Sequence, residues 1–158
     1  MLKDYAMEFA KYKTLGSKTL AQIPDDALNM ITATDGNSIA MIIRHLHGNL
    51  VSRFTDFLTT DGEKTSRDRQ AEFATVTYSR SEVEAFWGDA WAHLETALSE
   101  LSDADLTKTI TIRGEAMTVD AALCRAVAHA AYHTGQIVLL GRTANAGAWE
   151  SLSIPRSK

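Results

Sequence analysis

Apolar side chains spaced three and four residues apart are the feature of this sequence that most constrains its fold. The spacing recurs in four stretches, at residues 2–23, 38–58, 81–101 and 118–143. In each stretch it gathers the apolar side chains on one face of a helix, which must be buried against another element. Four such helices in a chain of 158 residues predict an all-α fold, a four-helix bundle that forms a single domain over residues 1–158.

Capping and turn residues predict where these helices begin. Asp35-Gly-Asn-Ser38 places an N-cap oxygen before the second helix, and Thr118 can cap the last one. Ser81-Glu-Val-Glu84 has the Ser-x-x-Glu form of a capping box at the start of the third. Residues 107–117 alternate as strands do, with Arg113-Gly-Glu115 as a turn. We therefore expect a short hairpin, supported by the bundle, just before the last helix.

Two segments lie outside the predicted helices. Residues 59–80 form a polar stretch, and a loop of this length in a compact domain is usually functional or mobile. The tail, residues 144–158, has no helical period. It carries Trp149, Leu152 and Ile154, so we expect it to pack across the domain.

Composition and charge narrow the possible functions. The formal charge of −4 and the pI near 5.7 provide no basic excess for a phosphate backbone, so we expect no nucleic-acid partner. Polar residues interrupt the best membrane candidate, residues 127–140, so we expect no membrane span. Residues 1–9 lack the apolar core of a secretory signal, which predicts a cytoplasmic protein. The single Cys124 excludes an internal disulfide, and we interpret it as a core packing residue.

Two histidines in the last predicted helix are candidate metal ligands. His129 and His133 are four residues apart, which places both imidazoles on one face of a helix. The residue after His129 is not Glu, so the pair lacks the general base of the H-E-x-x-H zinc proteases. Gln136 continues the same face and either orients an imidazole or a water, or is only a polar residue near the helix end.

The second predicted helix offers two candidates for the third ligand. His45 and His47 differ in azimuth by about 200°, so only one of them can face the pair on the last helix. Asn49 and Arg53 follow His45 at four-residue intervals and make a polar stripe, which favours His45 by periodicity but leaves His47 open. His93 is more typical of a partly buried histidine that bonds to a carbonyl than of a ligand.

Longer strings in the chain resemble a bacterial subgroup of the DinB-like (DinB/YfiT-like) metalloenzyme superfamily, a subgroup with no assigned reaction. The resemblance covers nearly the whole chain. It implies an up-down-down-up four-helix bundle, often dimeric, that holds zinc or nickel by one histidine of the second helix and two of the fourth. Those ligands fall on His45, His129 and His133, whereas His47 and His93 match none. The similar strings are Asn37-Ser38-Ile39, His45 to Lys64, Arg67-Asp-Arg69, Glu72-Phe73, Ile112-Arg-Gly-Glu115, His129 to Ile137 and Trp149 to Pro155.

Three neutral imidazoles leave a divalent ion with an open coordination position, which is typical of catalytic zinc sites. Such an ion can lower the pKa of a bound water or hold a thiol as its thiolate. Asn49, Arg53 and Gln136 would then line the pocket. The planar fork of Arg53 suits a substrate carboxylate, or else it serves only a structural ion pair with Asp56 or Asp61.

The resemblance favours one reaction class. Characterised DinB-like proteins transfer or isomerise small-molecule substrates with a low-molecular-weight thiol such as bacillithiol, mycothiol or glutathione. It therefore implies metal-dependent thiol S-transfer by a homodimer, for which Trp87 and Trp91 are candidate residues of a helical dimer face. Two alternatives are open. The first is metal-dependent hydrolysis, although no carboxylate base is evident beside the histidines, and the second is a metal-stabilised stress-response binding module without turnover.

Overall fold

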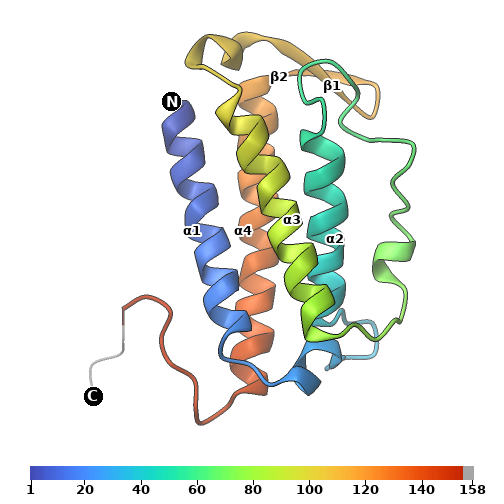
Figure 1. Cartoon of the computed structure of the whole chain (residues 1–158), viewed down its shortest axis with the longest axis vertical. Coiled ribbons are helices and arrows are strands. Elements are labelled where there is room, and N and C mark those ends of the chain that lie inside the picture. Colours follow the sequence, from blue (N-terminus) through green and yellow to red (C-terminus); the bar gives the residue numbers. More distant parts are fainter. Residues whose placement is uncertain (155–158) are drawn as a thin grey trace.

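The computed structural model describes residues 1–154 of the chain and has four long helices and one small antiparallel sheet (Figure 1). This confirms the prediction of a mostly helical fold with four helices and a hairpin before the last of them. The helices are α1 (Leu2–Leu20), α2 (Ile39–Phe54), α3 (Arg80–Ser99) and α4 (Val119–Ala144), the strands are β1 (Thr109–Ile112) and β2 (Glu115–Thr118), and the short 3-10 helices are η1 (Asp25–Asn29), η2 (Ala71–Phe73) and η3 (Asp103–Thr107).

Side-chain caps start three of the long helices. The Ser38 hydroxyl accepts a hydrogen bond from a backbone N–H of α2, and Thr118 does the same for α4. The capping box of α3 is formed by Ser79 and Glu82, two residues earlier than predicted. The Ser-x-x-Glu pattern fits both registers of this sequence. The structure selects the earlier register, in which Ser79 donates its N–H to the Glu82 carboxylate at 2.8 Å.

Two predicted helices end earlier than their apolar pattern. The first was expected to reach Ile23 but α1 ends at Leu20, and the second was expected to reach Leu58 but α2 ends at Phe54. Ile23 is nevertheless buried, because the chain beyond each helix end still packs against the core. Buried apolar residues therefore extend the apolar spacing beyond the last turn of each helix.

The hairpin turns through Arg113 and Gly114, which have φ angles of 57° and 76°. Left-handed backbone at both central residues suits a two-residue hairpin turn, so Glu115 belongs to β2 and not to the turn as predicted. Ile110 and Ile112 are buried, so β1 leans on the bundle.

Helices α1 and α4 lie side by side and run in the same direction. The Tyr5 hydroxyl near the start of α1 donates to the Asp120 carboxylate near the start of α4 at 2.8 Å. At the other end, Gly141 lets the two helices approach closely, since a Cβ there would lie 2.5 Å from a methyl carbon of Thr19. Helix α2 packs mainly against α3 and also faces α4, and the space between α2 and α4 holds the candidate site.

Two sequence interpretations are wrong, and a third holds only in part. Cys124 is exposed, because it lies on a face of α4 that the bundle leaves uncovered. Trp87 and Trp91 are only 5% and 1% exposed, so they pack inside this chain and offer no dimer face. In the tail, Trp149 packs against the core but Ile154 is 89% exposed. The end of the predicted tail, residues 155–158, lies outside the described residues.

No helix within residues 1–154 has both the length and the apolar character needed to cross a membrane.

Candidate metal centre

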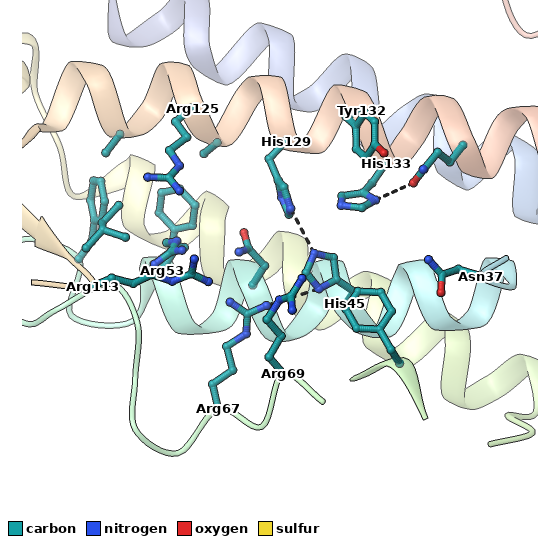
Figure 2. A pocket seen from close by; sticks show the side chains of 18 residues that line it. Asn37, His45, Arg53, Arg67, Arg69, Arg113, Arg125, His129, Tyr132 and His133 are labelled. Carbon is teal, nitrogen blue, oxygen red and sulfur yellow. Dashed lines mark hydrogen bonds between the residues drawn. The ribbon is translucent and has the colours of Figure 1, made fainter. Parts of the chain in front are cut away.

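Three histidines from two helices meet between α2 and α4. His45 projects from α2, and His129 and His133 project from α4 (Figure 2). One ring nitrogen from each can be chosen so that all three lie within 4.8 Å of one another. The Nε2 atoms of His45 and His129 are 3.2 Å apart. The structure therefore brings together the three histidines that the family resemblance selected.

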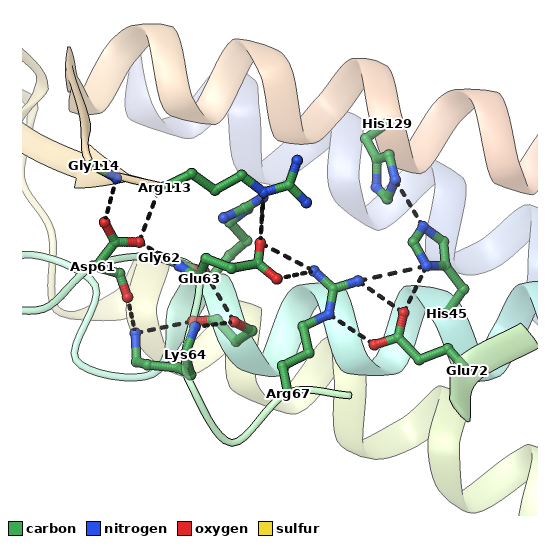
Figure 3. A network of polar contacts seen from close by, with 12 residues as sticks. His45, Asp61, Gly62, Glu63, Lys64, Arg67, Glu72, Arg113, Gly114 and His129 are labelled. Carbon is green, nitrogen blue, oxygen red and sulfur yellow. Dashed lines mark hydrogen bonds and ion pairs between the residues drawn. The ribbon is translucent and has the colours of Figure 1, made fainter. Parts of the chain in front are cut away.

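A buried carboxylate orients His45. Glu72 Oε2 lies 2.8 Å from His45 Nδ1, and Arg67 donates to both oxygens of that carboxylate at 2.7 and 2.8 Å (Figure 3). An ionised carboxylate only accepts hydrogen bonds, so Nδ1 of His45 carries the proton. Nε2 then presents its lone pair to the other two histidines, as metal-binding imidazoles held by a carboxylate do.

Gly48 admits Glu72 to this position. Glu72 is 1% exposed, and a Cβ on Gly48 would lie 1.9 Å from its Oε1 atom. The carboxylate thus rests directly on the backbone of α2, one turn from His45. Burial raises the pKa of the Glu72 carboxyl, but its hydrogen bonds with Arg67 and His45 and the positive charge of Arg67 outweigh this and hold that pKa below its usual value.

Gln136 holds His133. The Gln136 side-chain oxygen lies 2.8 Å from His133 Nδ1 and is one turn further along α4. A carbonyl oxygen accepts, so Nδ1 of His133 donates and Nε2 keeps its lone pair. Of the two interpretations left open for Gln136, this contact supports the orientation of an imidazole.

His129 is half-buried, and its Nδ1 atom is fully buried without a polar partner among the described residues. Burial, followed by the nearby His133, His45, Arg67 and Arg53, lowers the pKa of His129 to about 3. Burial also lowers the pKa of His133, although the hydrogen bond that this ring donates to Gln136 opposes the effect. Imidazoles that stay neutral are the form that binds a metal. The donor set, its protonation and its spacing therefore fit a divalent metal.

The histidines line a cavity of about 680 Å³, large enough for a small organic molecule. The three sequence-predicted pocket residues, Asn49, Arg53 and Gln136, line it as well. The other lining residues are Asn37, Phe54, Phe57, Arg67, Arg69, Phe73, Ile112, Arg113, Ala122, Arg125, Ala126 and Tyr132.

The ion pair of Arg53 differs from both pairs that the sequence suggested. Its NH2 nitrogen lies 3.2 Å from the Glu63 carboxylate, and not beside Asp56 or Asp61. Asp61 instead accepts three backbone N–H groups, from Glu63, Arg113 and Gly114 (Figure 3). Those bonds fasten the segment after α2 to the hairpin turn.

The two remaining histidines lie outside the cluster. His47 Nε2 is 2.8 Å from the Asp89 carboxylate of α3, on a different face of α2 from His45. His93 Nδ1 lies 3.0 Å from the backbone carbonyl of Asp89, as expected for a partly buried histidine bonded to a carbonyl. Neither belongs to the group of possible metal ligands found among the described residues.

Sequence reasoning missed the roles of Glu72 and Arg67. It also concluded that no carboxylate is evident beside the histidines, which is wrong because Glu72 contacts His45. Both residues lie in the long polar segment after α2, where the available signal was the length of the loop together with its similarity to the family at Arg67-Asp-Arg69 and Glu72-Phe73. That signal does not say which acid of the segment returns to the helix.

Comparisons with known proteins agree with the fold. The crystal structure of a DinB-like protein from Bacillus cereus ATCC 10987 has a TM-score of 0.71 at 19% identity, over 94% of this chain and 96% of that one. A mutant of the mycothiol-dependent maleylpyruvate isomerase has a TM-score of 0.69 at 14% identity, over 91% of this chain and 67% of the other. No curated protein sequence matches the chain. The family "Protein of unknown function (DUF1572)" matches residues 1–158, so the chain belongs to this family, and its fold is DinB-like.

Proposed function

We propose that this protein is a metal-dependent transferase that uses a low-molecular-weight thiol, with His45, His129 and His133 as ligands of one divalent ion. The observation that carries the proposal is the approach of one nitrogen from each of these histidines to within 4.8 Å of the others. The group lies at the wall of a cavity of about 680 Å³, so an ion held there would be accessible to a small molecule. Zinc and nickel both suit imidazole ligands.

Neighbouring side chains prepare the three imidazoles for this role. Glu72 and Gln136 hold the Nδ1 atoms of His45 and His133, which turns the Nε2 lone pairs toward the cluster. The ring of Phe73 packs on His45 with centroids 4.8 Å apart, and limits its rotation. The three side chains therefore lose little conformational entropy when they bind an ion.

When bound, a divalent ion with three neutral imidazoles supplies positive charge at an open position, which favours the ionised form of a thiol. Asn49, Arg53 and Gln136 line the space beside that position. The amides can donate to or accept from a substrate, and the Arg53 fork can hold a carboxylate. Likeness in fold to a mycothiol-dependent enzyme supports a thiol as cosubstrate.

Hydrolysis is less well supported than thiol transfer. Its general base would have to be Glu72, but this carboxylate accepts two hydrogen bonds from Arg67 and one from His45, with a lowered pKa. A carboxylate so occupied is a weak proton acceptor.

The homodimer and the up-down-down-up helix order implied by the family resemblance are part of the thiol-transferase proposal.

A thiol screen tests the proposed reaction. Protein loaded with zinc or nickel is mixed with a chlorodinitrobenzene and with bacillithiol, mycothiol, glutathione or no thiol. We expect conjugation with at least one thiol, in which a sulfur–carbon bond forms, chloride leaves and the thiol proton passes to solvent. His129→Ala should abolish it. Cleavage of ester substrates without thiol would instead support the hydrolase, and inactivity in every arm would support the binding module.

A further inference from the structure

Arginines gather at one end of the cavity. Arg53 comes from α2, Arg113 from the hairpin turn and Arg125 from α4, and the three lie together on the hairpin side of the histidines (Figure 2). Arg67 and Arg69 line the cavity nearer to His45 (Figure 2). Of the lining residues that the structure describes, five are arginines and none is acidic, in a chain whose formal charge is −4.

Helix geometry joins the arginines to the histidines. On α2, His45 and Arg53 are eight residues apart, and on α4, Arg125 precedes His129 by four. These spacings correspond to about 12 Å and about 6 Å along the helix axes. One small molecule of ordinary length therefore reaches from the arginine end to the histidine end.

The acids behind the cavity wall do not balance these charges. Glu63 contacts Arg53, Arg67 and Arg113 at 3.2, 3.3 and 3.1 Å (Figure 3). Glu72 pairs only with Arg67 among the lining arginines. Five guanidinium groups against these two carboxylates leave an excess of three positive charges. Within residues 1–154, Arg69 and Arg125 form no ion pair.

One nitrogen of Arg53 lacks an acceptor although the residue is buried. Its residue is 8% exposed, and its NH1 group makes no hydrogen bond to the described residues. Burial lowers the pKa of the Arg53 guanidinium, Glu63 opposes this, and the positive charges of Arg113, Arg67 and Arg125 add to the lowering. Glu63 therefore compensates this guanidinium only in part, and an anion bound in the cavity that Arg53 lines would offset the remaining positive charge.

We propose that Arg53, Arg113 and Arg125 form an anion-binding subsite, so that the small molecule accepted by this cavity carries a carboxylate or phosphate group. The inference rests on the proposed function only in placing the other end of that molecule at the histidines. Guanidinium forks bind planar carboxylates and phosphates through paired N–H groups. The three arginines come from three separate elements, so together they fix the position of a bound anion. A single surface arginine would not fix it.

The subsite is tested first without metal. Metal-free protein is titrated by calorimetry with succinate, with inorganic phosphate and with the neutral analogue succinamide. We expect succinate or phosphate to bind and succinamide not to bind, and the tighter of the two anions identifies the class of acidic group. Failure of both anions to bind, or equal binding of succinamide, would overturn the proposal.

Arg125→Gln is the decisive variant. Arg125 is exposed and has no ion-pair partner among the described residues, so this change should leave the fold intact. We expect anion binding to weaken about 10-fold or more, the value for a lost charged hydrogen bond. Arg142→Gln is the matched control, because it removes the same charge from the last turn of α4 outside the cavity. Equal weakening in both variants would reveal non-specific charge attraction and would overturn the subsite.

A last arm separates the subsite from the metal proposal. Metal-loaded protein is titrated with mercaptosuccinate and with mercaptoethanol. We expect the acidic thiol to bind more tightly, and Arg125→Gln to remove its advantage. If the protein binds no metal, this arm fails while the succinate arm still succeeds, so the two proposals fail separately. Equal affinity for both thiols in metal-loaded wild-type protein would contradict the subsite.

Discussion

The two ends of the cavity are built in different ways. The histidine end is mostly buried, and all three imidazoles project from the long helices α2 and α4. The arginine end is charged and partly exposed, and it draws Arg113 from the hairpin and relies on Glu63 of the segment after α2. Helical spacing therefore positions the first end, whereas docking of a loop and a hairpin onto the helices positions the second.

One side chain connects the ends. Arg67 donates to Glu72, which holds His45, and it also contacts Glu63, which holds Arg53 and Arg113 (Figure 3). The side chain of Arg67 is 3% exposed, so these ion pairs are screened little by solvent. The comparison becomes testable by variants that change one end while the other is measured.

The largest expected effect is at the histidines. Replacing His45, His129 or His133 by Ala should abolish stoichiometric metal, because two imidazoles without further ligands hold a divalent ion weakly. His47→Ala and His93→Ala should keep full metal content, since both side chains face Asp89. Elemental analysis of the purified proteins measures this. Full metal occupancy in His129→Ala would disprove the assignment. Loss of metal in His47→Ala would show that the face of α2 that carries His47, and not the face that carries His45, meets the metal.

A smaller effect separates the two acids that Arg67 joins. Glu72→Gln keeps the shape of the side chain but removes its charge from His45, and we expect about 10- to 100-fold weaker metal binding. Glu63→Gln makes the same change at the arginine end and should leave metal affinity unaltered. Competition with a chromogenic chelator gives both affinities. Equal weakening in the two variants would show that the ends are not independent.

Two helical glycines differ in their surroundings. Gly48 is in close contact with Glu72, whereas Gly88 has open space where a Cβ would be. Gly48→Ala should destabilise metal-free protein by about 1–3 kcal/mol, because its Cβ must displace the buried Glu72. Gly88→Ala on α3 should stabilise by about 1 kcal/mol, since a Cβ there meets nothing within 4 Å and Ala favours the helix. Guanidinium unfolding curves measure both changes. A stabilised Gly48→Ala protein would mean that Glu72 moves freely.

The smallest effect concerns the loop attachment at the arginine end. Backbone N–H groups of Glu63, Gly114 and Arg113 lower the pKa of Asp61 in the folded chain. Its ionised form therefore contributes stability above the ordinary pKa of about 4, and this contribution is lost as pH falls through the lower folded pKa. Asp61→Asn should reduce the melting temperature slightly at pH 7, with a difference from wild type that shrinks below about pH 4.

Exposed Asp35, which makes no hydrogen bond through its carboxylate within residues 1–154, supplies the control. Asp35→Asn should follow the wild-type melting temperature at every pH. Metal content should be the same in both variants, because Asp61 acts on the arginine end. A constant difference between Asp61→Asn and wild type down to pH 2 would contradict the role of the carboxylate charge.

The sequence predicted the long helices well and their boundaries less well. Apolar periodicity located all four helices, because their inner faces pack against one another. It overran the ends at Ile23 and Leu58, where burial outlasts the helix. It also misplaced Cys124, Trp87 and Trp91, because residue type alone does not say which side of a helix the rest of the chain covers.

The sequence by itself determined the pair His129 and His133, since four-residue spacing on a helix brings two side chains together without help from the rest of the fold. The choice of His45 over His47 needed the family resemblance, because periodicity in one helix does not tell which face meets another. Only the tertiary structure decided that Glu72 supports His45 and that Arg113 joins Arg53 and Arg125. These contacts join residues far apart in the sequence through a loop and a hairpin. The spacing of apolar residues along the sequence does not predict the course of either segment.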